Sequence, residues 1–291
     1  MTAPASPAPI SSDVEPDIDI AKIPDWLLTH PELHKRGIVL HEPLQPFTVY
    51  STQWRPEGPI YVVKAIDPSK PEADFYELFD RYSDSPTDHT VPHEVIRCDR
   101  PLSILATFDQ VLEGVEHLHR LHIAHGDLYT HNVIGATEED ARRDARLTAG
   151  RVYLIDFESC QRFEHGPGVQ TAVPLPDTHV TPPLGMKTFD PFSWDVYCLG
   201  RTLEGIVEER FMISVEKEPW IPGLFARWLK GNEVGCTSVC HCRPTVTKAR
   251  RMLKVIRWFV GVAELFVTIA GYPTTLFRTL RGHRLDDQSA L

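Results

Sequence analysis

One stretch of eight residues carries a carboxylate, an amide and two imidazoles at a spacing that suits phosphoryl transfer. It runs from His125 to Asn132, reads HGDLYTHN, and places Asp127 and Asn132 five residues apart. Phosphoryl transfer needs a carboxylate that orients the attacking hydroxyl and accepts its proton, together with oxygen ligands that hold Mg²⁺ against the phosphates. Asp127 suits the first task and Asn132 the second.

The segments on either side of this stretch predict elements that would position it. Residues 107–122 place apolar side chains on one stripe of an amphipathic helix, at Phe108, Val111, Leu112, Val115 and Leu118. The short apolar run 152–157, VYLIDF, predicts a strand with Asp156 at its far end. Between them, the charged insert 137–150 is expected to be a solvated loop.

The order of these features resembles the protein-kinase superfamily, whose catalytic loop H-x-D-x-x-x-x-N is followed by a strand ending in D-F-G. The resemblance implies ATP and Mg²⁺ as cofactors. It makes Asp127 the catalytic base, assisted by Asn132, and makes Asn132 and Asp156 the magnesium ligands. His125 is expected to pack beneath the loop. The structural alternative is that Asp127 and Asn132 are ordinary turn formers.

A lysine and a glutamate nearer the N-terminus match the small-lobe ion pair of that family. Lys64 lies in the β-branched run 60–66, IYVVKAI, and matches the strand lysine that contacts the ATP phosphates. Glu72 best matches its helical partner, because Phe75, Tyr76 and Phe79 follow at helical spacing. We expect Lys64 and Glu72 to pair and to bind ATP; Glu77 is the alternative acid. Otherwise Lys64 is an edge lysine and Glu72 a surface charge.

Two later motifs extend the resemblance. Residues 189–200, FDPFSWDVYCLG, resemble the large-lobe helix of protein kinases, in which the aspartate equivalent to Asp195 holds the catalytic-loop backbone. This helix should begin at Asp190 and Pro191, with Ser193 as an alternative cap, and should be largely buried. Cys242-Arg243-Pro244-Thr245 resembles the R-P-T that opens a late helix, which gives Arg243 a structural role.

The sequence also departs from the kinase pattern. Between Lys35 and Pro59 the only glycines are Gly37 and Gly58, so no glycine-rich loop precedes Lys64. Eleven residues, 97–107, are too few for a full adenine-binding hinge. Three substitutions add to these departures: Gly126 replaces an arginine of the catalytic loop, Glu158 replaces the last glycine of D-F-G, and Leu184 replaces a glutamate that would pair with Arg243. Nucleotide binding is therefore expected to be weaker than in an intact kinase.

Together these features predict an α+β, two-lobed protein-kinase-like fold with a truncated, β-rich small lobe and a mainly helical large lobe. We expect a disordered tail over 1–21, which holds four prolines and no basic residue, and a kinase-like domain over 22–252. The lobes are expected over about 22–100 and 101–252, and a helical tail over 253–291. That tail should pack on the large lobe or lie on a membrane through Phe259, Val262, Phe266 and Ile269.

Composition limits the partners and the compartment. A net charge of −10, with no basic stripe, makes nucleic acid an unfavourable partner. Six cysteines without a recognisable export signal indicate reduced thiols and a cytoplasmic or nuclear protein. Cys236, Cys240, His241 and Cys242 lack the usual zinc spacing and are interpreted as ordinary thiols and a histidine. The apolar run 258–270 is short for a membrane span.

Three functions compete at this point. The first is a protein kinase-like transferase that phosphorylates Ser or Thr hydroxyls of a protein substrate. The second is a pseudokinase, in which the scaffold serves binding and ATP is bound weakly or not at all. The third is a small-molecule kinase, because His-Gly-Asp-Leu and Ile-Asp-Phe-Glu also resemble the loops of aminoglycoside and choline kinases. Asp195 and Arg243, in their motifs, favour the first function over the third.

Overall fold

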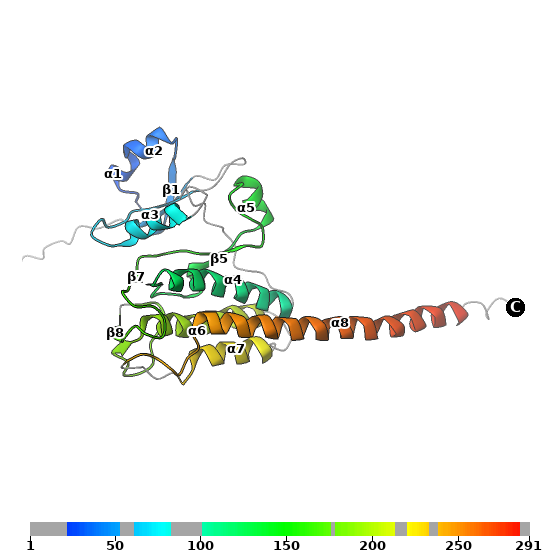
Figure 1. Ribbon diagram of the computed structural model, residues 1–291. Coiled ribbons are helices and arrows are strands. Elements are labelled where there is room, and N and C mark those ends of the chain that lie inside the picture. Colours follow the sequence, from blue (N-terminus) through cyan, green and yellow to red (C-terminus); the bar gives the residue numbers. More distant parts are fainter. Residues whose placement is uncertain are drawn as a thin grey trace, which may run out of the picture. The chain divides into compact units, whose positions relative to one another are not determined.

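The computed structural model describes residues 22–52, 61–82, 101–175, 178–212, 220–232 and 238–285, which form an α+β protein (Figure 1). The chain divides into two compact units, Met1–Asp67 and Pro68–Leu291. The sequence placed the lobe boundary near residue 100, and the difference concerns α3 (Glu72–Tyr82). Phe75 of α3 packs with Leu118, Ile123 and Cys160, which assigns this helix to the larger unit. The expected tail 1–21 and residues 83–100 lie outside the described residues.

The smaller unit is built on an antiparallel sheet in the order β1-β2-β3. Its strands are Leu40–Gln45, Val49–Thr52 and Val62–Lys64, and the short helices α1 (Asp25–Leu28) and α2 (Pro31–Lys35) precede them. Leu27, Leu40 and Tyr50 form its buried core. Lys64 lies on β3 opposite Val49, so the predicted strand lysine is on a strand.

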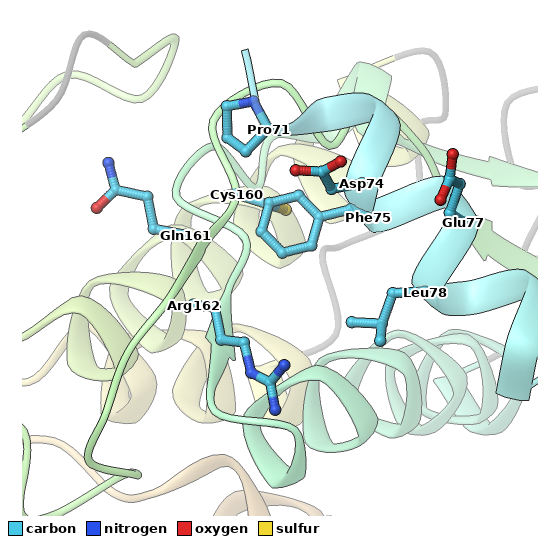
Figure 2. Close-up of a pocket in the computed structure, with 8 residues that line it drawn as sticks. All are labelled: Pro71, Asp74, Phe75, Glu77, Leu78, Cys160, Gln161 and Arg162. Atoms are coloured by element: carbon cyan, nitrogen blue, oxygen red, sulfur yellow. The ribbon is translucent and has the colours of Figure 1, made fainter. Parts of the chain in front are cut away.

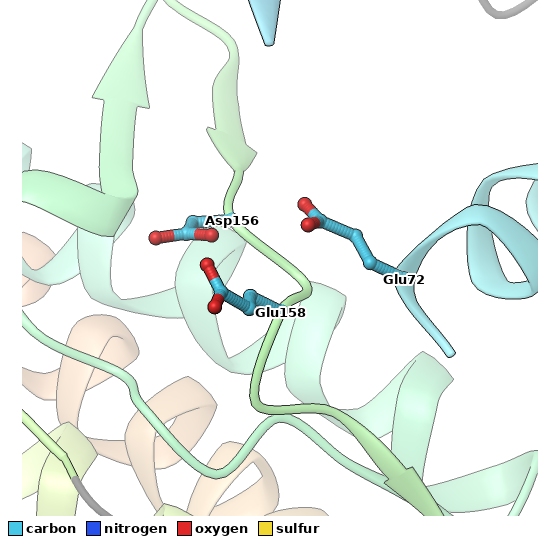
Figure 3. A group of neighbouring side chains, drawn as sticks. All are labelled: Glu72, Asp156 and Glu158. Carbon is cyan, nitrogen blue, oxygen red and sulfur yellow. The ribbon is translucent and has the colours of Figure 1, made fainter. Parts of the chain in front are cut away.

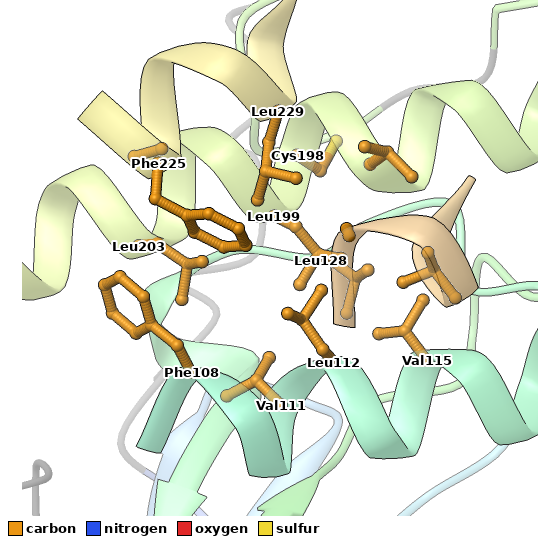
Figure 4. Packing of buried hydrophobic residues seen from close by; sticks show 14 of the residues in the cluster. Phe108, Val111, Leu112, Val115, Leu128, Cys198, Leu199, Leu203, Phe225 and Leu229 are labelled. Carbon is orange, nitrogen blue, oxygen red and sulfur yellow. The ribbon is translucent and has the colours of Figure 1, made fainter. Parts of the chain in front are cut away.

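The larger unit has a core made by four helices. They are α4 (Pro101–Arg120), α6 (Pro191–Met212), α7 (Trp220–Lys230) and the first part of α8 (Val246–Leu285). Figure 4 shows the apolar side chains of α4 facing those of α6 and α7, with Leu128 between them. The stripe predicted for α4 is confirmed, because all five of its apolar residues are buried: Phe108, Val111, Leu112, Val115 and Leu118.

Helix α6 begins where the sequence predicted. One carboxylate oxygen of Asp190, Oδ1, accepts hydrogen bonds from the backbone N–H groups of Phe192 (3.0 Å) and Ser193 (3.2 Å), so Asp190 is the cap. Its other oxygen accepts from the backbone of Cys240 at 3.0 Å. Residues 191–200 are buried without exception, as expected for a helix at the centre of the unit.

Short strand pairs frame the loop between α4 and α6. β4 (Ile123–Ala124) pairs with β7 (Gln161–Arg162), and β5 (Val133–Gly135) pairs with β6 (Val152–Leu154). The 3₁₀ turn η1 (Thr130–Asn132) precedes β5, and β8 (Val173–Pro174) pairs with β9 (Thr188–Phe189) further along. The HGDLYTHN stretch is therefore held at both ends by hydrogen-bonded strands.

The insert over 137–150 was expected to be a loop, and this expectation was wrong in part. Residues Glu138–Arg143 form the helix α5. Thr137 caps it, because its hydroxyl accepts from the backbone of Asp140 at 3.1 Å while the Asp140 carboxylate accepts from the Thr137 backbone at 2.9 Å. This reciprocal capping stabilises a helix too short to form on its charge pattern alone.

Helix α8 is one continuous element of 40 residues, so the predicted boundary between residues 252 and 253 falls inside it. Ion pairs fasten its first part to α4: Arg250 contacts Asp109 (3.2 Å), Glu113 (2.6 Å) and Glu116 (2.8 Å). Arg257 contacts Asp109 at 2.5 Å. Among the described residues, no helix combines the length and apolarity needed to cross a bilayer.

The crossing of α6 and α7 gives a test of the fold. A Cβ added to Gly200 would lie 2.8 Å from the carbonyl oxygen of Ala226 and 2.7 Å from Cγ of Lys230. Overpacking costs about 1–3 kcal/mol, which exceeds the ~1 kcal/mol by which alanine is the better helix former. Gly200→Ala should therefore lower the free energy of unfolding measured by urea denaturation. Gly261→Ala in α8, where a Cβ meets nothing within 4 Å, should raise it; equal effects would contradict the packing.

Candidate active site

The backbone of the HGDLYTHN loop is held by one buried carboxylate. Asp195 of α6 is 0% exposed. Its Oδ2 accepts from the backbone N–H of His125 at 2.8 Å, and its Oδ1 accepts from that of Gly126 at 2.9 Å. The ring of His119, at the end of α4, lies 2.9 Å from Oδ2. Asp195 thus occupies the structural place that the kinase resemblance assigned to it.

Two further side chains of α6 bind the same loop from below. Trp194 donates its indole N–H to the carbonyl of Gly126 at 2.8 Å, and Thr202 donates its hydroxyl to the carbonyl of Leu128 at 2.9 Å. Within the loop, Asn132 donates its side-chain N–H to the carbonyl of Asp127 at 2.9 Å. This bond leaves the amide oxygen of Asn132 as the atom able to serve as a metal ligand.

Gly126 is required by its position. Its φ is +82°, and a Cβ there would lie 2.6 Å from the carbonyl oxygen of Ser159. An L side chain at this position would be unfavourable for two reasons, the left-handed backbone conformation and the clash with Ser159. The arginine that kinases often carry at this point would not fit the observed backbone, which explains the departure noted in the sequence.

His125 packs beneath the loop, as predicted. It is 0% exposed, and its Nε2 lies 3.2 Å from the carbonyl oxygen of Ile155. Its ring is 5.4 Å from that of Phe157. Burial lowers the pKa of His125, although the carboxylate of Asp195 opposes the shift. The imidazole is therefore neutral at pH 7 and joins the strand that ends at Asp156 to the loop.

The carboxylate of Asp127 is capped by a residue that sequence reasoning missed. His179 donates its backbone N–H to Oδ1 of Asp127 at 2.7 Å, and its Nδ1 lies 2.5 Å from Oδ2. The His179 ring stacks on Tyr129, with centroids 4.4 Å apart and planes 14° apart. Asp127 is 7% exposed at its side chain, whereas His179 is 61% exposed. Each oxygen of the predicted base thus has one contact with His179.

Three carboxylates gather beside the loop. Glu72 of α3 meets Asp156 and Glu158, with one oxygen from each lying within 4.8 Å of the others (Figure 3). Glu72 is buried, and Lys70 forms an ion pair with Glu158. Oxygen ligands at this separation suit a hard cation such as Mg²⁺. Glu72 and Asp156 were predicted from the sequence as site residues, whereas Glu158 was noted only as the residue that replaces the last glycine of D-F-G.

The hydroxyl of Tyr129 is affected by the charges of both Asp127 and Asp156. Burial raises the pKa of the Tyr129 hydroxyl, and the charges of Asp127 and Asp156 raise it further. The phenol therefore lies in the field of both carboxylates. Convergence of Asp127, Asn132 and Asp156 on shared metal ligands remains a prediction. So does the pairing of Lys64 with Glu72, since Lys64 belongs to the smaller unit and Glu72 to the larger.

Arg243 has other partners in place of the glutamate that the kinase pattern would supply. Its Nε donates to the carbonyl of Lys230 at 2.8 Å and its Nη1 to the hydroxyl of Ser193 at 3.2 Å. The guanidinium also lies 5.2 Å from the centre of the Tyr197 ring. Leu184, at the position of the lost glutamate, is fully exposed. Arg243 thus ties the start of α8 to α6 and α7.

A cavity of about 610 Å³ lies between α3 and the segment that leads into β7 (Figure 2). None of its lining residues belongs to the HGDLYTHN loop. The cavity adjoins the helix that carries Glu72, and it is lined by Pro71, Asp74, Phe75, Glu77, Leu78, Cys160, Gln161 and Arg162.

One segment of the chain matches a known protein family. The pattern of the lipopolysaccharide kinase (Kdo/WaaP) family matches residues 105–166. This range holds most of α4, the whole HGDLYTHN loop and Asp156. The chain carries a protein-kinase-like domain. No curated protein matches the sequence.

The kinase-like domain combines an α+β architecture with a loop whose backbone is fixed by α6. The two-unit division, a small unit built on a sheet and a larger helical one, agrees with the two-lobed fold expected from the sequence. The matched family covers the segment in which the loop, β5 and β6 follow one another. Lys64, Glu72, Asp195 and Arg243 lie outside the match.

Removal of the Asp195 carboxylate should release the loop of the kinase-like domain. Asp195→Ala leaves two buried N–H groups without an acceptor, at a cost of about 1–3 kcal/mol each. Urea denaturation should show a loss of about 2–6 kcal/mol, and the amides of His125 and Gly126 should exchange with solvent faster. Asp74→Asn, at an exposed position of α3, should change stability by less than about 0.5 kcal/mol. Unchanged amide exchange in Asp195→Ala would show that the loop is held by other contacts.

Proposed function

We propose that this chain is an ATP-dependent kinase that phosphorylates a hydroxyl of a carbohydrate-bearing acceptor. The observation that carries the proposal is the match of residues 105–166 to a lipopolysaccharide kinase family. It is supported by the loop geometry, in which a nearly buried Asp127 lies beside Tyr129 and His179. The match favours the small-molecule kinase among the three functions over transfer to a protein Ser or Thr.

Asp127 is the proposed base of the reaction. The acceptor hydroxyl oxygen forms a bond to the γ-phosphorus while the bond from that phosphorus to the β–γ bridging oxygen breaks, and ADP leaves. The proton of the hydroxyl passes to the carboxylate of Asp127. The hydrogen bond from Asn132 to the Asp127 carbonyl and the bonds from Asp195 keep the loop in place, so little reorganisation accompanies the transfer.

The acidic group offers the ligands for a divalent cation. Asp156 and Glu158 would hold Mg²⁺, with Asn132 as a further oxygen ligand, and Glu72 lies close enough to take part. When bound, Mg²⁺ neutralises charge on the transferred phosphate. Asp156 has φ +63°, an uncommon value for a residue other than glycine, which turns the chain between β6 and Glu158. This turn brings the two carboxylates to the same side.

The pseudokinase remains the second candidate, and one observation favours it. The backbone N–H of His179 bonds to Oδ1 of Asp127 and its ring contacts Oδ2, so the imidazole shields the oxygen that an acceptor hydroxyl would approach. A chain in which this contact is permanent would bind partners without transferring phosphate. The two candidates differ in whether the contact opens.

Transfer by the wild type and by Asp127→Asn decides between the candidates. Loss of a general base lowers a rate by about 10²- to 10⁴-fold, so Asp127→Asn should abolish measurable transfer from ATP. The acceptors to test are water, a panel of mono- and oligosaccharides, and a panel of Ser/Thr peptides. Glu138→Gln, on the exposed face of α5, is the matched control and should keep the wild-type rate.

The outcomes of this assay are separable. Transfer to a saccharide that disappears in Asp127→Asn supports the carbohydrate kinase, whereas transfer to peptides alone restores the protein kinase. Thermal stabilisation by Mg-ATP that is lost in Asp156→Asn and reduced in Glu158→Gln tests the metal ligands apart from activity. If no acceptor is phosphorylated, whether or not the nucleotide binds, the proposal of an enzyme is wrong and the pseudokinase is the remaining candidate.

Removal of the His179 ring should make the carboxylate of Asp127 more accessible. A hydrogen bond to a charged group is worth about 1.5–3 kcal/mol, and exposure of the ring reduces this to about 1 kcal/mol. His179→Ala should therefore raise ATP hydrolysis, with water as the acceptor, about fivefold. His131→Ala removes an exposed ring of the same loop that also contacts Tyr129, and should leave the rate unchanged. A tenfold loss of rate in His179→Ala would make His179 a residue that positions the base.

A further inference from the structure

Helix α8 carries two apolar stripes, and among the described residues one of them packs against the rest of the chain while the other is exposed. The first stripe packs on the large-unit core through Ala249, Leu253 and Val260, with Ile256 partly buried beside them. The ion pairs of Arg250 and Arg257 with α4 fix the helix with this face inward. The orientation of α8 over these residues is therefore settled by both apolar contacts and charge.

The second stripe is exposed and continuous. Large apolar side chains recur at spacings of three, four and seven residues, which places them along one side of a helix. They are Met252 (44% exposed), Val255 (51%), Trp258 (63%), Phe259 (61%), Leu265 (58%) and Phe266 (68%). Single exposed apolar residues are ordinary, whereas a row of six that includes three aromatic rings is typical of an interaction surface.

The charge of α8 differs in sign from that of the whole protein. The chain has a net charge of −10, yet the sequence of α8 holds eight Lys or Arg residues and a single acid, Glu264. Lys248, Arg251 and Lys254 are exposed beside the second stripe. A helix with aromatic residues next to basic ones suits the boundary between lipid headgroups and acyl chains.

We propose that this second stripe of α8 is a docking surface for an anionic lipid bilayer. The apolar side chains would enter the boundary of the acyl chains while Lys248, Arg251 and Lys254 contact lipid phosphates. An anionic bilayer attracts these basic residues, whereas a second copy of the chain carries the same positive charge on this face and so offers no complementary charge there. The stripe runs from Met252 to Phe266, which is about 21 Å along the helix axis.

Vesicle co-sedimentation of the full chain tests the proposal. The probes are vesicles of phosphatidylcholine alone and vesicles that also contain phosphatidylserine. The wild type should bind the anionic vesicles, and binding should weaken as salt rises. Arg251→Ala with Lys254→Ala should reduce the partition constant roughly 25-fold, because each basic residue near the surface contributes about fivefold.

The apolar stripe has its own variant and control. Phe259→Ser with Phe266→Ser should abolish co-sedimentation while leaving the urea denaturation curve unchanged, because both side chains are exposed. Val169→Ser, at a residue that is 61% exposed outside α8, should bind as the wild type does. Equal binding by the wild type and the Phe259/Phe266 variant overturns the proposal. So does a lipid-free dimer, measured by light scattering, that the same variant dissociates, because the second copy would then be the occupant.

Discussion

The candidate active site depends on the burial of one carboxylate, that of Asp195. A charge removed from water is costly unless hydrogen bonds replace its hydration, and here the replacements are the N–H groups of His125 and Gly126 and the ring of His119. The need to satisfy this charge fixes the distance between α6 and the loop. Because α6 is buried along residues 191–200, it transmits the rigidity of the helical core to a loop without regular structure. Asp127 is then presented by a backbone that has few alternatives.

The same constraint explains why a glycine precedes Asp127 in the loop. The loop turns between the Asp195 carboxylate and the carbonyl of Ser159, and Gly126 lies at the closest point with a positive φ. Trp194 and Thr202 bind the carbonyls that this turn exposes on the inner side. Four polar groups of the loop backbone thus have partners on α6: the N–H groups of His125 and Gly126 and the carbonyls of Gly126 and Leu128. The side chains of Asp127, Tyr129 and Asn132 are oriented by other contacts.

The sequence predicted the parts of this arrangement that depend on local pattern. The stripe of α4, the Asp190 start of α6 and the strand before Asp156 follow from periodicity and capping chemistry, which residues close in sequence determine. The role of Asp195 was instead implied by the resemblance to protein kinases, because its contact with His125 spans 70 residues. His179 was missed because it lies 52 residues from Asp127, in a segment without periodicity or motif. Glu158 was misjudged for a related reason: its nearness to Glu72 depends on the packing of α3, which the sequence assigned to the other lobe. The helix α5 was missed because the high density of charged residues in 137–150 was interpreted as a loop, although Thr137 and Asp140 form a capping box there.

The two proposals, transfer at Asp127 and bilayer docking through α8, place different demands on the molecules that would bind there. At Asp127 an acceptor must be small enough at its reacting end to enter beside His179 and Tyr129, where the carboxylate is 7% exposed. On the second stripe of α8 the partner must instead be extended, apolar and anionic. A phosphorylated or acidic glycolipid is one class of molecule that meets both demands, because its sugar hydroxyl is compact while its lipid portion belongs to a bilayer. The two proposals stay independent, since lipid binding by α8 requires no chemistry at Asp127, and transfer to a soluble saccharide requires no bilayer.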